Sequence, residues 1–439
     1  MAHLRSRDTP MGATAERRRD RCVTARGRTR VTNMNNSPIE IAGGGLSGLS
    51  AALAVARRGR AAHVFERRRE VGARFHGDFQ GLENWSTEGD VLEELESLGI
   101  APTFSYAPFR ECVFFDPDGR EHVCRSSKPL WYLVRRGTDA GTLDQALKAQ
   151  ALAAGVDLRC GEAVEHLPHG GIVAHGPRHV DAIAVGYVFA TDRSDAAFGA
   201  VSDDLAPGGY AYLLICRGRA TLATCMFDDF HHDKQYLART VQFFERKVGV
   251  TPRDARAFGG FGNMSAEPTL RRGNMLVAGE AAGLQDALFG FGMRYALVSG
   301  HLAGDAFATN DLGRYTQDCR QRFGRAIRAS AVNRYLYRLA GRHRYRTLVE
   351  RVAGAADPRA WLRGYYSGRW WMPFVLPLAR ADAQRRRASP VHECRDGCDC
   401  TYCRCLRDAV GQQPLDTTAT VDRNVSDAAP VSAAHRKAC

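Results

Sequence analysis

The sequence lacks the features that mark membrane-spanning, secreted and repeat proteins. No apolar run reaches the roughly eighteen residues that a membrane-spanning helix requires, and the N-terminal segment has no apolar core of the kind found in a secretory signal. No segment recurs at a fixed period. With 439 residues, of which 44% are hydrophobic and 25% charged, the chain is long enough for two or three domains. We therefore expect a cytoplasmic globular protein.

Acidic residues are scarce at the N-terminus. Residues 1–33 contain nine arginines against three acidic residues, within a chain whose formal net charge is +13. No hydrophobic period accompanies these arginines, so we expect residues 1–37 to be a disordered basic extension. We interpret Met34 as the true start and the residues before it as an upstream extension. A nucleic-acid-binding tail is the less favoured alternative.

One segment near the N-terminus has the pattern of a dinucleotide-binding βαβ unit. An apolar strand beginning at Ile39 leads into G-x-G-x-x-G and an apolar-periodic helix, and a second strand ends at an acid. The glycines permit the tight turn, the close approach to a pyrophosphate and the packing of helix on strand. The helix N-terminus favours phosphates, and the acid accepts hydrogen bonds from ribose. The predicted cofactor-binding residues are Gly43, Gly45, Leu46, Ser47, Gly48, Glu66 and Arg67.

A second segment, residues 273–294, reads as a strand, an acidic turn and a Gly-Phe-Gly helix start. It resembles the G-D-A-A-G…G-x-G signature of FAD-dependent oxidoreductases of the p-hydroxybenzoate hydroxylase and geranylgeranyl reductase type. The resemblance implies FAD as the cofactor, with Glu280 in place of the usual Asp on the ribityl chain. It also implies that the following helix points its N-terminus at the flavin pyrimidine. The implied contacts are Gly279, Glu280, Gly283, Gly290 and Gly292.

The segments that concern the reductant match this family less well. Either Arg135 or Arg136, before a helix from about Thr142 to Ala154, matches the family arginine that reaches the cofactor. The family's Asp-Gly motif should fall near Val185 but is absent, and no second dinucleotide fingerprint occurs. Direct use of NADPH is therefore in doubt, and another reductant or an electron-donor protein is the alternative.

Two further segments are candidates for the substrate side of the site. Pro207 to Ile215 resembles half of the Pro-x-x-Tyr-x-Trp-x-Phe-Pro motif that lines the substrate cavity of geranylgeranyl reductases, with Tyr210 and Tyr212 as its aromatic residues. The loop after the second strand contains Arg74, which we predict contacts the cofactor, and His76. Many geranylgeranyl reductases carry a cysteine in that loop, which is absent here. We predict Tyr210, Tyr212 and His76 as cavity-wall and proton-supplying residues.

The resemblance implies an enzyme that transfers a hydride through flavin N5 to or from a carbon–carbon double bond of a hydrophobic substrate, with an isoprenoid as one candidate. A flavin monooxygenase is the alternative within enzymes. A regulatory flavoprotein that binds nucleic acid is the alternative from another class, although we do not expect nucleic acid as a partner. Halogenases of this fold carry a W-x-W-x-I-P motif, which the chain lacks.

An aromatic and basic stretch occurs late in the chain, from Trp370 to Ala379 between Arg369 and Arg380. Aromatic rings beside basic residues suit a membrane interface, so a peripheral membrane contact is one interpretation. A core segment that covers the substrate cavity is the favoured one, because two prolines are expected to prevent a regular amphipathic helix.

Cysteines number thirteen, and five of them cluster near the C-terminus at the spacing C-x3-C-x-C-x2-C-x-C. Thiolates this close on a turn-rich segment can converge on one zinc ion or an iron–sulfur cluster. A disulfide that exchanges electrons with the flavin, and free or oxidised thiols, are the alternatives. The candidate metal ligands are Cys394, Cys398, Cys400, Cys403 and Cys405.

The predicted fold class is α/β: a Rossmann-like FAD-binding domain with a parallel sheet, a substrate domain with a mixed or antiparallel sheet, and a helical C-terminal region. The FAD-binding domain is expected to be discontinuous. The predicted ranges are 38–190 with 270–310 for FAD binding, 195–265 with part of 100–135 for the substrate, 311–390 for the helical region, 391–406 for the cysteine cluster and 407–439 for a disordered tail.

Overall fold

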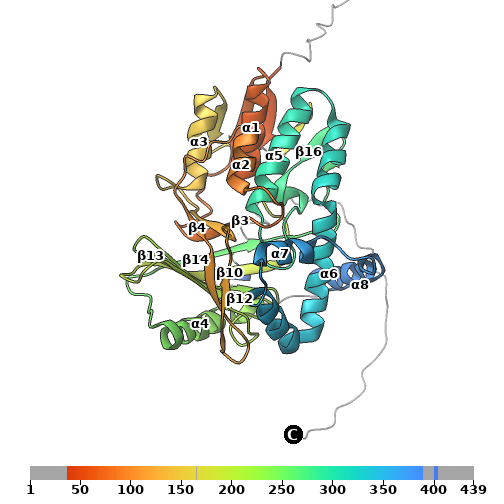
Figure 1. The fold of residues 1–439 in the computed structure, drawn as a ribbon. Helices are drawn as coiled ribbons and strands as arrows, with labels where there is room; N and C mark the ends of the chain where they lie inside the picture. The colour runs from red at the N-terminus through yellow and green to blue at the C-terminus, as the bar shows by residue number, and fades with distance from the viewer. Residues whose placement is uncertain (1–36, 165, 389–399, 404–439) are drawn as a thin grey trace, which may run out of the picture. The chain divides into compact units, whose positions relative to one another are not determined.

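A computed structural model describes residues 37–164, 166–388 and 400–403 (Figure 1). The predictions for the basic extension and the C-terminal tail lie outside these residues, as do Cys394, Cys398 and Cys405. The described residues from Pro38 onward belong to one compact unit, in which three sheets and a set of C-terminal helices are packed together.

The first sheet contains the predicted βαβ unit. Among the described residues it has six strands in the order β15-β16-β9-β1-β2-β8, and only β15 is antiparallel to its neighbour. The strands are β1 (Ile39–Ala42), β2 (Ala62–Glu66), β8 (Asp157–Cys160), β9 (Gly171–Val173), β15 (Arg271–Arg272) and β16 (Met275–Val277). The parallel strands β1 and β2 end at the glycine turn and at the predicted acid, respectively. Both features therefore meet at the carboxyl edge of this sheet, where ligands bind in open α/β sheets.

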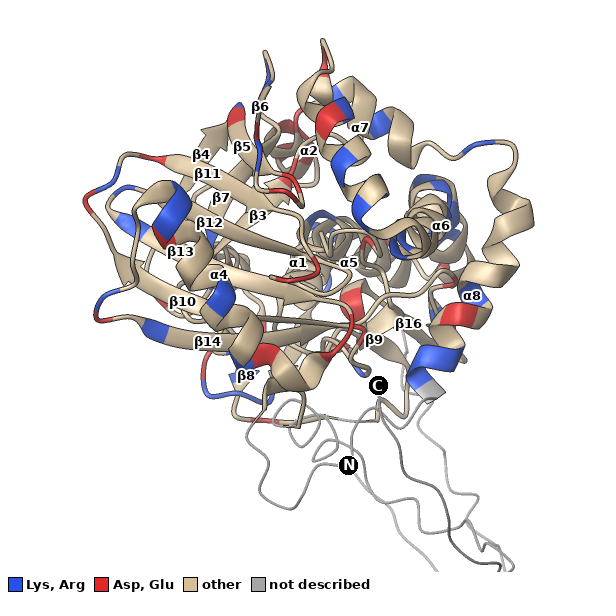
Figure 2. Cartoon of the chain, turned by 90° about the horizontal axis from the view of Figure 1, so that it is seen from below, with Lys and Arg blue, Asp and Glu red and all other residues tan. Residues whose placement is uncertain are grey.

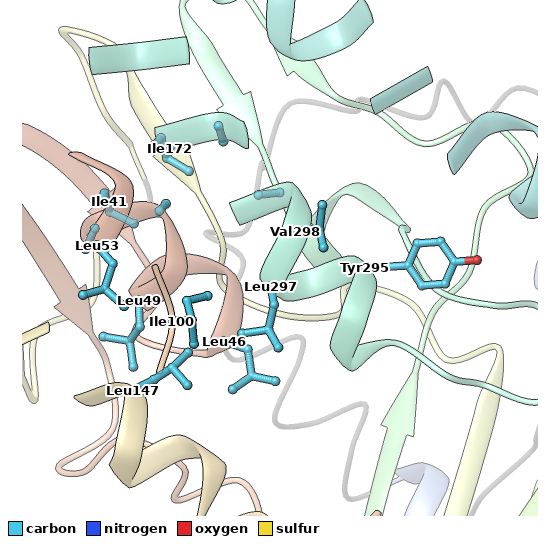
Figure 3. Packing of buried hydrophobic residues seen from close by; sticks show 14 of the residues in the cluster. Ile41, Leu46, Leu49, Leu53, Ile100, Leu147, Ile172, Tyr295, Leu297 and Val298 are labelled. Atoms are coloured by element: carbon cyan, nitrogen blue, oxygen red, sulfur yellow. The ribbon is translucent and has the colours of Figure 1, made fainter. Parts of the chain in front are cut away.

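Helices α1 (Leu46–Arg57), α3 (Leu143–Ala153) and α5 (Met293–Ala308) pack with this sheet into one apolar core. Figure 3 shows leucines of α1 beside Leu297 and Val298 of α5. The close contact of α1 and α5 depends on two glycines of α5, Gly300 and Gly304. A Cβ atom at either position would overlap the backbone of α1 at Ser47 or Ala51. Two segments almost 250 residues apart in sequence are thereby held together beside the glycine turn.

The other two sheets contain the predicted substrate segments. In the described chain the second sheet has the order β14-β10-β13-β12-β11-β5-β6, antiparallel except for the β11–β5 pair, and the third has the order β3-β7-β4. Helix α4 (Asp233–Val248) covers the second sheet through buried residues such as Phe244. The strands are β3 (Phe79–Glu83), β4 (Tyr106–Phe109), β5 (Glu111–Phe115), β6 (Glu121–Arg125), β7 (Trp131–Arg135), β10 (Ala182–Ala190), β11 (Ala196–Ala200), β12 (Tyr210–Cys216), β13 (Arg219–Met226) and β14 (Arg256–Gly262).

The C-terminal region is helical, as predicted. Its helices are α6 (Leu312–Ala353), α7 (Pro358–Tyr366) and α8 (Met372–Ala388). Helix α6 is kinked at Gly341, whose backbone angles (φ 48°, ψ −138°) are not helical. Three short elements complete the described chain: α2 (Val91–Ser97), and the 3₁₀ turns η1 (Phe230–His232) and η2 (Gly279–Ala282). None of the described helices is both long and apolar enough to cross a membrane.

The expectation that two prolines prevent a helix after Trp370 is wrong, because α8 contains both of them. Pro373 lies in the first turn, where a backbone N–H has no helical partner to lose. Pro377 lies inside the helix, where the packing of Met372 and Leu376 against α6 compensates for a missing hydrogen bond. No residue of this stretch lines the cavity described below, so the favoured interpretation as its cover is also wrong.

Candidate functional site

A cavity of about 1270 Å³ extends from the carboxyl edge of the first sheet along the faces of the second and third sheets. Its polar part is lined by the glycine turn, the end of β2 and residues 174–178. Its middle part is lined by residues 74–76, 78–81, 257–262, 280, 284–285 and 289–293. Its apolar part is lined by Phe114, Cys124, Leu130, Trp131, Leu348, Val349, Val352 and Leu362. Segments from both predicted domains therefore surround one space.

The three glycines of the fingerprint have different roles. Gly43 has a positive φ of 110°, and a Cβ atom there would overlap the carbonyl group of Ala174. A Cβ atom at Gly48 would overlap the carbonyl oxygen of Gly43, so this glycine allows α1 to start close to β1. A Cβ atom at Gly45 would meet no other atom within 4 Å. Gly45, together with Leu46 and Ser47, lines the cavity, which leaves open space in front of the first helical N–H groups.

Glu66 fixes the glycine turn from the end of β2. One carboxylate oxygen accepts a hydrogen bond from the backbone N–H of Gly44 at 2.8 Å, and the other accepts one from Arg68 at 2.9 Å. Glu66 and Arg67 both line the cavity. The carboxylate therefore stands at the position where a dinucleotide ribose is expected.

The predicted acid of the second motif pairs with the predicted arginine of the loop after β2. The guanidinium of Arg74 donates to Glu280 at 2.8 Å and to the backbone carbonyl of Phe261. Both charged side chains line the cavity. This ion pair connects η2, β14 and the loop after β2, so the two cofactor motifs meet in space although they lie over 200 residues apart.

The remaining glycines of the second motif act in two ways. Gly279 and Gly283 have positive φ angles, and Cβ atoms there would contact Ser47 and Ser265, respectively, so they permit close packing behind the cavity wall. Gly290 and Gly292 line the cavity at the start of α5.

Gln285 lies among these glycines and was not predicted. Its side-chain amide donates to the carbonyl oxygen of Gly290 at 2.7 Å, and its buried carbonyl oxygen has no hydrogen-bond partner within the described part of the chain. Gln285 lines the cavity. A buried acceptor without a partner is costly unless a ligand supplies a donor. The residue lies within the second motif, between Gly283 and Gly290, but the motif assigns no role to this position and an uncharged side chain there gave no indication of one.

The two arginine candidates after β7 differ. Arg136 is buried and forms a bidentate pair with Asp144 of α3, at 2.9 and 2.8 Å, while its guanidinium lies 3.9 Å from the ring centre of Phe75. Arg136 contributes to the cavity wall, whereas Arg135 does not and instead donates to the carbonyl oxygen of Ala140 at 2.7 Å. Arg136 therefore anchors the loop after β2 to α3.

His76 and Asp78 line the middle of the cavity. The Asp78 carboxylate accepts hydrogen bonds from the backbone N–H of His76 at 2.9 Å and from the side chain of Gln80 at 2.8 Å. The imidazole of His76 stacks on Phe258 of β14. Burial lowers the pKa of His76, Arg256 and Arg68 lower it further, and Asp78 opposes them. Together these influences favour the neutral imidazole of His76.

The two predicted tyrosines project from one face of β12 but have different surroundings. The hydroxyl of Tyr210 donates to the carbonyl oxygen of Phe289 at 2.5 Å. The hydroxyl of Tyr212 has no hydrogen-bond partner among the described residues, and this side chain also lines the cavity. Burial raises the pKa of both tyrosines well above the ordinary value, so both hydroxyls stay protonated.

A second pocket of about 320 Å³ adjoins the cavity at His76. It is lined by three arginines (Arg217, Arg219 and Arg256) and one acid, Asp139. None of the three guanidinium groups forms an ion pair with any residue that the structure describes. The pocket therefore concentrates positive charge beside the middle of the main cavity.

Part of the cysteine cluster lies against the second sheet. The backbone N–H of Cys403 points at the sulfur of Cys400 at 3.5 Å, and Thr401 donates through its backbone to Asp233 at 2.9 Å. Thr401 contributes to the cavity wall beside Gly259. Within the described residues, no group of three metal-ligating side chains occurs. The other three predicted ligands lie outside the described chain, so metal binding here stays a prediction.

The comparisons with known proteins bear on the fold. The NAD(P)-binding Rossmann-like domain family matches residues 41–80. A search of curated proteins gave no match. A solved structure from Thermoplasma acidophilum, described as geranylgeranyl bacteriochlorophyll reductase-like, is similar with a TM-score of 0.60 and 18% identity, covering 81% of this chain and 97% of that chain.

Two further solved structures agree with this result. The flavin-dependent brominase Bmp2 gives a TM-score of 0.56 at 15% identity, covering 79% of this chain and 98% of that chain. A flavoprotein/dehydrogenase from Cytophaga hutchinsonii gives 0.55 at 14% identity, covering 80% and 100%. At these identities the likeness establishes the fold alone, and the predicted α/β architecture is confirmed.

Proposed function

We propose that the chain is an FAD-dependent oxidoreductase that reduces, or forms, a carbon–carbon double bond in a hydrophobic molecule. The observation that carries this proposal is the continuity of the cavity. One space runs from a phosphate-binding glycine turn, past an Arg74–Glu280 pair, to a wall of aromatic and aliphatic side chains. Its volume of about 1270 Å³ exceeds the roughly 300–1,000 Å³ of ordinary ligand pockets, which leaves room for a cofactor and a second molecule.

The residues present fit FAD. Gly45 leaves the space that a pyrophosphate needs at the N-terminus of α1, and Glu66 offers its carboxylate to the ribose. Glu280 and Arg74 offer one acceptor and one cation to the ribityl and phosphate groups. Gln285 offers a buried acceptor without a protein partner, which suits an N–H group of the flavin ring.

Bound FAD supplies two-electron hydride chemistry. The chain itself excludes water, since its apolar end is lined by residues such as Trp131, Val352 and Leu362, and this wall orients a hydrophobic substrate. Reduction of a double bond also needs a proton. Tyr212 holds one at its hydroxyl, because burial raises the pKa of this side chain and no described residue binds its hydroxyl. Tyr210 is tied to Phe289 and serves to position the wall.

The second pocket supports a phosphate-bearing reductant such as NADPH. Three guanidinium groups without ion-pair partners among the described residues favour a dianionic group, and His76 lines both spaces. A reductant that binds here would therefore lie next to the middle of the cavity. If this is correct, Arg256→Ala raises the KM for NADPH but not for NADH, while Arg253→Ala, on the exposed loop before β14, changes neither.

The experiment that separates reduction from oxygenation uses the FAD-loaded protein after anaerobic reduction. The reduced protein is mixed either with a panel of isoprenoid alkenes or with air, and the return of the oxidised flavin absorbance is followed. We expect slow reoxidation in air and faster reoxidation by an alkene, with a saturated product. Fast oxygen consumption with release of hydrogen peroxide, and no reaction with any alkene, would instead support the monooxygenase alternative.

A further inference from the structure

One side of helix α8 (Met372–Ala388), together with the turn just before it, exposes large apolar side chains. Trp370 is 83% exposed, Phe374 75% and Leu378 56%. Phe374 and Leu378 are four residues apart and lie on one side of α8, and Trp370, in the turn before the helix, precedes Phe374 by four residues. The exposed positions between them are Pro373 and Pro377, which are also apolar. The opposite side of α8, with Met372, Leu376 and Ala379, is buried against its neighbours, including α6.

This pattern is unusual for the described part of the chain. The other large hydrophobic side chains exposed there, Val123, Leu152 and Leu339, lie on three different elements. Single exposed hydrophobic residues are normal, whereas a contiguous row marks an interaction surface. We call the row Trp370, Phe374 and Leu378 the apolar stripe of α8.

The arginines near the apolar stripe fall into two groups, those that pair with acids of the protein and those that do not. Arg380, Arg386 and Arg387 form ion pairs with Glu267, Asp382 and Asp181 on the protein itself. Arg369 stands exposed just before the stripe and Arg385 about two helical turns after it, and neither forms an ion pair with any described residue. Figure 2 shows the basic residues of α8 gathered toward its C-terminal end. The stripe therefore has an unpaired cation before it and another after it.

These features favour a lipid surface as the partner that covers the apolar stripe. Rings and aliphatic groups between two cations match acyl chains bordered by phosphate headgroups, and Trp is favoured at that depth. The stripe covers nine residues, 370–378, or roughly 13 Å at 1.5 Å per residue, which is too short to span a bilayer but suits a helix that lies flat on it. Three side chains bury roughly 500 Å² at most, less than the roughly 800 Å² per partner of a stable protein dimer.

We propose that the apolar stripe of α8 inserts into the surface of an anionic membrane, with Arg369 and Arg385 on the lipid phosphates. This surface would hold the protein beside lipophilic molecules, the substrate class given above, but the membrane contact itself does not depend on the cofactor. The membrane contact depends only on the exposed side chains of α8 and of Arg369 and Trp370 just before it.

The test uses the full chain and sedimentation with vesicles of phosphatidylcholine, with or without phosphatidylglycerol. The triple variant Trp370→Ser, Phe374→Ser, Leu378→Ser removes the stripe, and Leu152→Ser, an exposed leucine on α3, is the matched control. Because each lost anchor weakens the partition several-fold or more, we expect the triple variant to bind at least about a hundredfold more weakly. Leu152→Ser should bind like the wild type. The double variant Arg369→Gln, Arg385→Gln should lose mainly the preference for phosphatidylglycerol.

Thermal melting by circular dichroism keeps the result interpretable, because all three stripe residues are exposed and their loss should leave the melting temperature unchanged. Binding that salt abolishes and that the triple variant retains would overturn the proposal, since it would come from basic residues elsewhere in the chain. A wild-type dimer in solution that the triple variant converts to a monomer would also overturn it, because the stripe would then be an interface between copies. A failure of FAD binding would affect neither outcome.

Discussion

The polar and apolar ends of the cavity are built by opposite means. At the polar end the chain removes side chains: Gly43 and Gly48 let backbone segments touch, and Gly45 leaves a space. At the apolar end it supplies them, with Trp131 from β7, Val349 from α6 and Leu362 from α7. A constant ligand such as a dinucleotide can be held by backbone groups, which no side-chain substitution removes. A variable substrate is selected by side chains, which can be exchanged without rebuilding the fold.

The largest effect is expected from a pair of glycine variants at the polar end. Gly48→Ala places a methyl group on the carbonyl oxygen of Gly43, so it should lower the free energy of unfolding by about 3 kcal/mol and abolish FAD binding. Gly45→Ala places the same group in open space, so it should leave stability within about 0.5 kcal/mol of the wild type. It should still weaken FAD binding at least tenfold by crowding the phosphates. Thermal melts and FAD titrations measure both. Equal loss of stability in the two variants would contradict the different roles assigned to these glycines.

The second expected effect concerns the tyrosines that face the substrate. Tyr212→Phe removes the hydroxyl proposed to hold the proton, so it should reduce the rate of alkene reduction by roughly a hundredfold with little change in stability. Tyr210→Phe removes a hydrogen bond to Phe289, so it should cost about 1 kcal/mol of stability and much less rate. Single-turnover kinetics and melting curves distinguish the two. If Tyr212→Phe reduces alkenes at the wild-type rate, the proton comes from another group.

A smaller effect is expected where the two motifs meet. Glu280→Gln keeps the size of the side chain but removes the charge that pairs with Arg74, so FAD affinity should fall roughly tenfold. Glu267→Gln is the matched control, because its carboxylate pairs with Arg380 at the surface away from the cavity. Titration of flavin fluorescence measures both variants. Unchanged affinity in Glu280→Gln would remove this acid from the cofactor site.

The smallest effect is a change in pH dependence at His76. In the folded protein its pKa is lowered by burial and by Arg256 and Arg68, whereas Asp78 raises it and offsets part of this effect. The folded state therefore binds this proton less readily than the unfolded state, and stability should fall as pH drops below the ordinary histidine pKa of about 6.5. Arg256→Ala should raise the pKa of His76, and Arg253→Ala should not. Histidine NMR titration is the measurement, and an unchanged pKa in Arg256→Ala would show that the guanidinium does not act on the ring.

The sequence predicted the polar end better than the apolar end, for a physical reason. The glycines, the helix and Glu66 form one local unit within 28 residues, so their spacing alone indicates how they fold. Residues such as Val349 and Leu362 meet Trp131 only after β7, α6 and α7 pack together, and no local pattern encodes that contact. The partnerless side-chain oxygen of Gln285 and the second pocket, whose arginines come from β14, from the start of β13 and from the turn before it, also depend on contacts between distant segments. Helix α8 itself was not predicted, although an outward aromatic stretch was one interpretation of these residues, because prolines in a first turn and on a solvated face do not prevent a helix.

The most direct test of the account is reconstitution of the purified full-length protein with FAD, followed by titration of flavin fluorescence and by the visible spectrum. The account predicts that one FAD binds per chain, that its spectrum shows the bands of a protein-bound flavin, and that Gly45→Ala weakens this binding at least tenfold while melting like the wild type. A folded protein that leaves the fluorescence of FAD unchanged at every concentration would contradict the assignment of the cavity and, with it, the proposed function.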